Sequence, residues 1–189
     1  MAKPQKSGVT GHSQEERENK RRTYEQNVKR SEDTIRYHSV EHMILLNADG
    51  TIRFETTDNL PSEVSPSAEM MPFMTDAVLS HNHPRGSCFS GADIKAAMFL
   101  GLKEIRATTA RYGTFVLQRT HEIGKEPEDY EDFPYAYANA MTSTAASIRS
   151  GLSNGTIRYE DAKRIEGERM GQWLTDHAPT YGWRFRKED

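Results

Sequence analysis

The sequence predicts an α/β fold, a sandwich of a small mixed sheet with flanking helices, followed by a C-terminal helical extension. Short apolar runs bounded by turn residues alternate with helix-forming segments through residues 37–125. Residues 126–189 are instead rich in helical, amphipathic patterns. Only 35% of the 189 residues are hydrophobic and 28% are charged. We therefore expect one well-packed domain, with part of the chain outside its core.

The N-terminal segment, residues 1–36, is predicted to be a charged arm. Residues 1–12 carry Pro4, Gly8 and Gly11 among polar residues, and we expect no regular structure there. Residues 13–36 are nearly all charged or polar, and the segment Glu15–Arg22 contains strong helix formers but no apolar stripe. This pattern fits either a solvated helix or a disordered arm.

Two strands joined by a tight turn come next. The apolar run His42–Leu46 has the length of a buried strand, and Asp49-Gly50 favours a sharp turn into a second strand at Thr51–Glu55. The segment Asp58–Ser67 contains two prolines and several serines, so it is predicted to be an irregular linker. Its length and position suggest that it lines a substrate groove.

A further short strand and a helix enclose the most informative run of the chain. The segment Asp76–Ser80 is apolar enough to be a buried strand, and residues two apart on a strand face the same way. His81 and His83 are therefore expected to converge on one point. Ser90 is a good N-cap for a helix that continues through Leu100.

The remaining elements complete the sheet and form the extension. Strands are predicted at Lys103–Thr109 and Gly113–Gln118, and helices at about residues 132–149 and 159–177. The ending Tyr181–Arg186 alternates aromatic and basic residues, which fits an edge strand and a basic contact patch equally well. Four aromatic residues near the start of the first helix are expected to pack it onto the sheet: Tyr130, Phe133, Tyr135 and Tyr137.

His81, His83 and Asp93 are candidate metal ligands. The two imidazoles would converge from the strand, and Asp93 would join them from the first turn of the helix. Two histidines and one carboxylate, with a position left for water, are the usual ligands of a catalytic zinc ion. The sequence therefore predicts a catalytic Zn²⁺ site.

These residues resemble the signature of the JAMM (MPN-plus, JAB-like) zinc metalloproteases: an upstream glutamate, His-x-His-Pro, a short loop and Ser-x-x-Asp. The similarity covers about residues 40–120, and the Phe-Ser-x-x-Asp-Ile ending is closest to phage and prophage members. It implies a JAB/MPN-like, cytidine-deaminase-like sandwich. One departure is the loop between His83 and Ser90, which has six residues, one fewer than the commonest form. This difference raises the question whether Asp93 and Ser90 reach the metal.

The resemblance also implies a mechanism. It places the catalytic glutamate just before an apolar strand, where this chain has Glu41, with Glu55 and Glu63 as weaker candidates. Glu41 would take a proton from the water that zinc activates and pass it to the leaving amine. Ser90 would donate to the developing oxyanion. The expected substrate is a protein or peptide cut at a peptide or isopeptide bond, as in deubiquitinases that act after a ubiquitin-like tail.

Other functions are compatible with parts of the same sequence. A JAMM-fold binding or assembly protein without turnover, such as a phage morphogenesis factor, stays open, whereas deamination is weakened by the missing Cys-x-x-Cys pair. An HNH nuclease is disfavoured because Asn82 would point away from both neighbouring histidines. Cys88 is the only cysteine, which excludes an internal disulfide and a multi-cysteine zinc site. We expect Cys88 to be a bystander.

Charge and hydropathy limit the partners. The net charge of −3 gives no general attraction to nucleic acid. The sequence shows neither an apolar N-terminal run nor a stretch of about 20 apolar residues for a membrane span. With a single cysteine, these features predict a cytoplasmic protein that acts on neither membranes nor nucleic acid.

Overall fold

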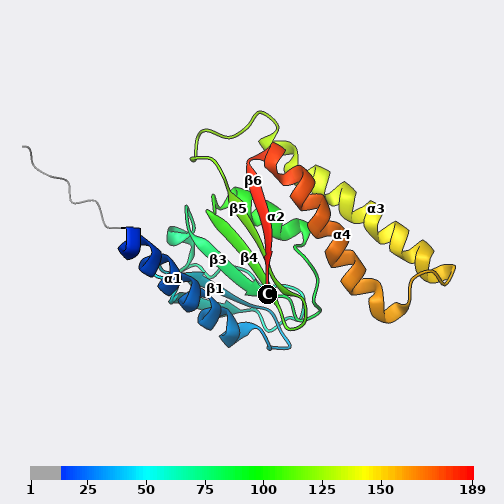
Figure 1. The fold of residues 1–189 in the computed structure, drawn as a ribbon, viewed down its shortest axis with the longest axis horizontal. Helices are drawn as coiled ribbons and strands as arrows, with labels where there is room; N and C mark the ends of the chain where they lie inside the picture. The colour runs from blue at the N-terminus through cyan, green and yellow to red at the C-terminus, as the bar shows by residue number, and fades with distance from the viewer. Residues whose placement is uncertain (1–13) are drawn as a thin grey trace, which may run out of the picture.

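The computed structural model describes residues 14–189, and within this range six strands form one mixed sheet (Figure 1). The expectation for residues 1–12 lies outside the described residues. The strand order is β2-β1-β3-β4-β5-β6, in which β3 and β4 are parallel and all other neighbours are antiparallel. The strands are β1 His42–Leu46, β2 Ile52–Thr57, β3 Val78–Asn82, β4 Glu104–Thr109, β5 Gly113–Arg119 and β6 Trp183–Glu188. The predicted α/β class is confirmed.

Helices cover both faces of the sheet. They are α1 Gln14–Ile35, α2 Gly91–Phe99, α3 Phe133–Ser153 and α4 Ala162–His177, with short 3₁₀ turns at Met71–Phe73, Tyr130–Asp132, Tyr159–Asp161 and Ala178–Tyr181. Helix α1 packs on β1 and β3, whereas α2 contacts β4 and α4 contacts β6. The main hydrophobic core fills the space on the side of α2, α3 and α4, and a smaller cluster lies under α1.

Strand alternation sends each residue of β3 to one of these two sides. Leu79 belongs to the main core, and His81, two residues later, faces the same way. Ser80 and Asn82 face α1: the Ser80 hydroxyl donates to a Glu32 carboxylate at 3.0 Å. The face that carries His81 is thus the face covered by α2, α3 and α4.

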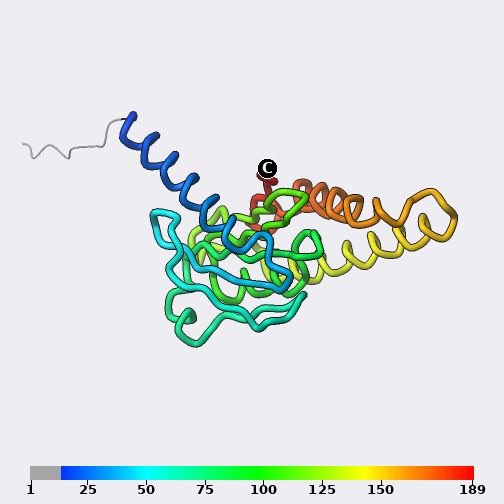
Figure 2. Tube along the Cα trace, turned by 90° about the horizontal axis from the view of Figure 1, so that it is seen from below, coloured from blue at the N-terminus to red at the C-terminus, as the bar shows by residue number. Residues whose placement is uncertain are grey.

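Residues Glu15–Arg22 are helical and exposed, whereas the second half of α1 packs on the sheet. Four of its residues are buried against the sheet: Val28, Ser31, Glu32 and Ile35. Their spacing of three, four and seven positions places them on one side of the helix. This stripe is short and half polar, which explains why the composition of the segment hides it. The N-terminal turns of α1 are exposed, and Figure 2 shows them leading away from the sheet.

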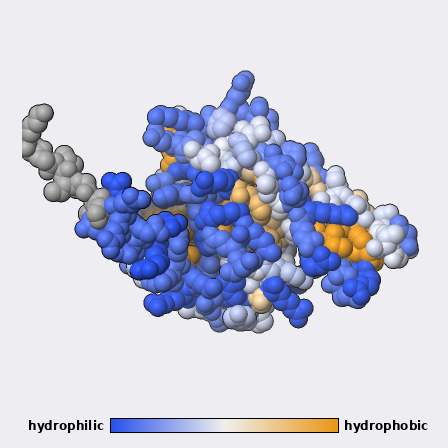
Figure 3. All heavy atoms as spheres, in the orientation of Figure 1, coloured by the Kyte–Doolittle hydropathy of each residue, from blue (hydrophilic) through white to orange (hydrophobic). Residues whose placement is uncertain are grey.

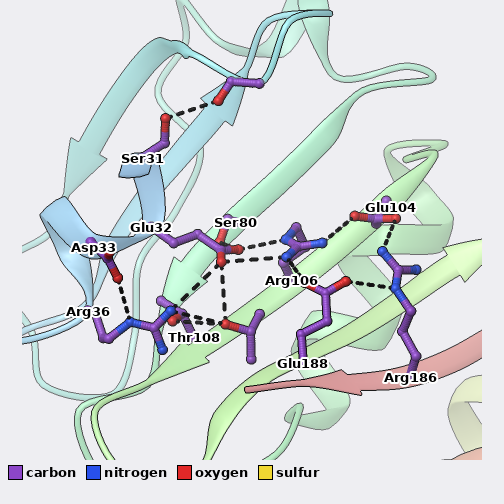
Figure 4. Close-up of polar contacts among 12 residues, drawn as sticks. Ser31, Glu32, Asp33, Arg36, Ser80, Glu104, Arg106, Thr108, Arg186 and Glu188 are labelled. Carbon is purple, nitrogen blue, oxygen red and sulfur yellow. Dashed lines mark hydrogen bonds and ion pairs between the residues drawn. The ribbon is translucent and has the colours of Figure 1, made fainter. Parts of the chain in front are cut away.

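A buried network of charges joins α1 to the sheet (Figure 4). Arg106 on β4 is 3% exposed and donates to Glu32 of α1, to Glu104 on its own strand and to Glu188 of β6. Arg186 of β6 adds a second contact to Glu104 at 3.1 Å. Burial opposes the charge of Arg106, but the surrounding carboxylates outweigh it and raise its pKa. Helix α1 and the last strand are therefore tied to one buried guanidinium.

The C-terminal segment forms a helical hairpin and then returns to the sheet. Figures 1 and 2 show α3 and α4 running side by side well beyond the sheet, and apolar atoms gather on this projecting part (Figure 3). Phe133 and Tyr137 are buried as predicted, but Tyr135 is exposed. Strand β6 pairs with β5, which confirms the edge strand at this end. None of the helices in residues 14–189 has the length and hydropathy needed to cross a membrane.

Candidate metal centre

Strand β3 and the residue that follows it position both histidines. The strand begins at Val78, two residues later than predicted, so that His81 lies within it and His83 follows its last residue. The backbone N–H of His83 still donates to the carbonyl of Thr108 on β4 at 2.8 Å, which extends the parallel pairing by one residue. The two side chains therefore share a face, as expected, and their Nε2 atoms are 2.8 Å apart.

Asp93 comes from the first turn of α2, and its position is set by the helix cap. The Ser90 hydroxyl accepts from the backbone N–H of Asp93 at 3.2 Å, and the Ser90 N–H donates back to Asp93 Oδ2 at 2.5 Å. This reciprocal capping box fixes the carboxylate at the positive end of the helix. The prediction that Ser90 caps this helix is confirmed.

The three candidate ligands meet. Asp93 Oδ1 lies 3.3 Å from His81 Nε2, and Oδ2 lies 3.5 Å from His83 Nε2. One ligand atom from each residue falls within 4.8 Å of the others, which is close enough for one ion. The six-residue loop therefore does not separate Asp93 from the histidines. A metal ion at this point would need small side-chain rotations, since the imidazole nitrogens now contact one another.

The loop after His83 is held by a tight turn. The backbone N–H of Gly86 donates to the His83 carbonyl at 2.9 Å, with Pro84 and Arg85 between them. Gly86 has a φ of +73°, and a Cβ there would come within 2.7 Å of the Tyr112 ring. Only glycine fits this position without strain. The turn thus fixes where the chain leaves His83.

The hydrogen bonds of His83 with Ser87 use its Nδ1 atom and leave Nε2 to face the other candidate ligands. Its Nδ1 lies 2.9 Å from the Ser87 carbonyl and 3.2 Å from the Ser87 hydroxyl. A carbonyl only accepts, so Nδ1 carries a proton, and in the neutral imidazole it is Nε2 that has the lone pair and faces Asp93 and His81. His81 Nδ1 is buried and has no hydrogen-bond partner among residues 14–189. Of the two imidazoles, only that of His83 is thus oriented by a hydrogen bond to the backbone among the described residues.

Burial and proximity shift the pKa values of this group. Burial opposes a charged His83, but its hydrogen bond to the Asp93 carboxylate outweighs burial and raises the pKa of His83 above 6.5. Burial works against the Asp93 carboxylate as well, and the two histidines overcome it and hold its pKa well below 3.8. The Asp93 carboxylate therefore stabilises a positive charge between these side chains.

Glu41 stands just before β1 and is 9% exposed. Its backbone is held from both sides: its N–H donates to the Leu60 carbonyl at 2.8 Å, and its carbonyl accepts from the Thr57 hydroxyl at 2.7 Å. Burial raises the pKa of the Glu41 carboxyl, and His83 and His81 oppose this only in part. A carboxylate with a raised pKa beside a cluster of ligands is the kind of group that accepts a proton in catalysis.

One cavity of about 280 Å³ connects these residues. The predicted base and the three ligands line it together with Ser90, whose hydroxyl hydrogen has no acceptor among the described residues. The irregular segment after β2 lines it too, as predicted. The full lining is Glu41, Met43, Pro61, Ser62, Glu63, Val64, His81, His83, Arg85, Ser87, Ser90, Ala92, Asp93 and Lys163.

Four residues that the sequence analysis also considered lie outside the ligand group. Glu55 contacts His42 Nδ1 at 2.9 Å and does not line the cavity, whereas Glu63 does. Asn82 faces the opposite side of the sheet, as expected, where it contacts the segment before β1. Cys88 is buried, and burial raises the pKa of its thiol to about 12, which disfavours a thiolate ligand or nucleophile.

Several residues of the site were not predicted as such. Ser87 orients His83, and Arg85 lines the cavity. Lys163 reaches the cavity from α4, far along the chain. The Tyr137 hydroxyl of α3 donates to the Phe89 carbonyl at 2.7 Å and holds the loop from the other side. The Tyr137 contact with this loop and the approach of Lys163 to the cavity have no local signal in the sequence.

Comparison of the chain with protein-family models, curated proteins and solved structures finds no match.

Proposed function

We propose that this protein is a zinc-dependent hydrolase that cleaves a peptide or isopeptide bond in a protein or peptide substrate. The observation that carries the proposal is the meeting of His81, His83 and Asp93 in one cavity with Glu41. Two imidazoles and a carboxylate leave a coordination position open, unlike the closed four-ligand set of a structural zinc. The JAMM-like order of these residues in the sequence supports the same assignment.

The donor set fits zinc. His83 presents Nε2 because its Nδ1 is engaged by Ser87, and this arrangement of a ligating histidine with a carbonyl partner is typical of metal sites. Asp93 presents a carboxylate whose pKa is held low, so it is ionised at neutral pH. Zinc bound here would supply Lewis acidity, which makes water a nucleophile near neutral pH.

The roles of the protein groups follow from their positions. Glu41 lines the cavity without belonging to the ligand group, so it is free to accept a proton from the attacking water and later deliver it to the leaving amine. Ser90 accepts from the N–H of Asp93 and keeps its own hydrogen available for the oxyanion. The segment 61–64 forms one wall of the cavity and is placed to contact the substrate backbone.

The first test is the metal content of the purified protein by elemental mass spectrometry. We expect about one zinc ion per chain in the wild type and in the control His177→Ala, whose imidazole lies outside the site. The double variant His81→Ala/His83→Ala is expected to lose it, because two of the three ligands are gone. Zinc-loaded protein is then screened against peptide and isopeptide substrates.

The result also decides between enzyme and assembly protein. No bound metal after reconstitution with zinc would contradict the hydrolase proposal. Zinc without turnover of any substrate would favour the non-catalytic JAMM-fold binding or assembly protein. In that case, removal of zinc with a chelator should leave partner binding unchanged.

A further inference from the structure

We propose that Arg85 and Lys163 form an anion-binding subsite beside the metal centre, which selects substrates with a carboxylate next to the scissile bond. The inference rests on the proposed hydrolase function and adds its substrate class. The carboxylate belongs either to the free C-terminus of a peptide or to an Asp or Glu side chain. Both sources present the same group to the two cations.

Arg85 is held at the edge of the cavity by the turn that follows His83. The hydrogen bond from Gly86 to the His83 carbonyl closes this turn, so Arg85 lies only two residues from a metal ligand and lines the same cavity. Its side chain is exposed and forms no hydrogen bond or ion pair with the described residues. A guanidinium presents several N–H donors in a plane that matches a carboxylate. Arg85 therefore has its donors free for a ligand.

Lys163 approaches from the first turn of α4. It lines the cavity, and its ammonium contacts Glu166 at 2.6 Å, three residues along the same helix. The Lys163 side chain is 52% exposed, and an exposed pair of this kind contributes little to stability. The ammonium can exchange Glu166 for a substrate carboxylate at small cost. Two cations from distant parts of the chain thus reach one cavity.

The charge of the cavity changes sign with metal. Its lining includes three carboxylates, from Glu41, Glu63 and Asp93, against the two cations Arg85 and Lys163. These three carboxylates and two cations together carry a net charge of −1 when ionised, and a bound divalent cation would bring the sum to +1 with both imidazoles neutral. An anionic substrate is therefore attracted to the zinc-loaded protein, and the two side-chain cations decide where its charge is bound.

The test measures binding rather than turnover. Three probes carry the same metal-binding group, a succinyl hydroxamate, and differ in the amino acid joined to its other end. The alaninamide probe is neutral, the alanine probe has a free terminal carboxylate, and the aspartic acid α-amide probe has a side-chain carboxylate. Dissociation constants for zinc-loaded protein are obtained by titration calorimetry. We expect at least one carboxylate probe to bind tenfold or more tightly than the neutral probe. That preference should fall at least threefold in Arg85→Gln and in Lys163→Gln.

Arg164→Gln is the matched control, because Arg164 is the next cation on α4 and does not line this cavity. It should keep the wild-type preference. Preference for the alanine probe alone would assign the subsite to C-terminal carboxylates, and preference for the aspartyl probe alone to acidic side chains. Equal binding of all three probes, or a preference that survives both variants, would overturn the inference while leaving the zinc site intact. Failure of the protein to bind zinc would overturn the proposed function and the inference with it.

Discussion

Asn82 Oδ1 accepts a hydrogen bond from the backbone N–H of His42 at 2.6 Å, so the strand that carries His81 is joined to the segment that carries Glu41. The Asn82 amide nitrogen also donates to the carbonyls of His38 and Val40. Asn82 lies between His81 and His83 in the chain but on the other face of the sheet. The Asn82 side chain thus holds the segment that carries Glu41 in register with the strand that carries His81.

Replacing Asn82 with alanine should lower stability and disturb Glu41. The change removes three hydrogen bonds and leaves one backbone N–H and two carbonyls without their partner. We expect a loss of about 2 kcal/mol in the free energy of unfolding, measured in urea. Asn139→Ala on the exposed side of α3 is the control. A stability equal to that of this control would show that the contact does not hold the segment.

Glu41→Gln should separate metal binding from catalysis. Glutamine has nearly the same size as glutamate but accepts no proton, so zinc content should stay near one per chain while kcat falls by about 10²- to 10⁴-fold. Glu63→Gln is the matched control, because Glu63 lines the same cavity but is exposed. Normal turnover by Glu41→Gln would remove Glu41 from the mechanism.

The meeting of His81, His83 and Asp93 was predictable because the signals that place these residues are local. His81 and His83 are two residues apart at the end of a strand, so the two-residue period of a strand places them on one face. Ser90 and Asp93 form the cap of the next helix, so capping chemistry predicts the position of Asp93. Glu41 depended on the resemblance to a known family. Its backbone is held by Thr57 and Leu60, which lie 16 or more residues away, and no local pattern shows these contacts.

The charge network was not predictable in the same way. Glu32 and Arg106 are 74 residues apart, and Glu188 is 82 residues from Arg106. Charged residues at alternate positions of a strand, as at Glu104 and Arg106, ordinarily indicate a face in water. Here they are covered because α1 packs over that face, and α1 carries too few apolar residues to reveal that it does.

Arg106→Ala should be strongly destabilising. Arg106 is the common partner of Glu32, Glu104 and Glu188, and its removal leaves buried carboxylates without their main cation. Breaking a buried ion pair from one side costs about 3–5 kcal/mol, which urea unfolding would measure. Arg184→Ala on β6 is the control, since Arg184 is exposed and donates only to Gln118 among the described residues. A cost below about 1 kcal/mol would mean that water replaces the guanidinium.

The stability of the protein should depend on pH in opposite directions with and without zinc. The pKa of His83 is raised above 6.5 by Asp93, so in metal-free protein this pair stabilises the fold fully below pH 6.5. That contribution is lost as the pH rises through the folded-state pKa of His83. Zinc needs both imidazoles neutral, so zinc affinity, and the stability that zinc adds, should instead rise over the same range.

Urea unfolding at pH 6.0 and pH 8.5, with saturating zinc and with chelator, would measure both trends. The His81→Ala/His83→Ala variant is the control, because it lacks the imidazoles for which a proton and zinc compete. Its stability should show neither the fall in chelator nor the rise in zinc, beyond the background from other groups. Parallel pH profiles for zinc-loaded and metal-free wild type would contradict competition between a proton and zinc at His83, since the metal could then bind without displacing a proton.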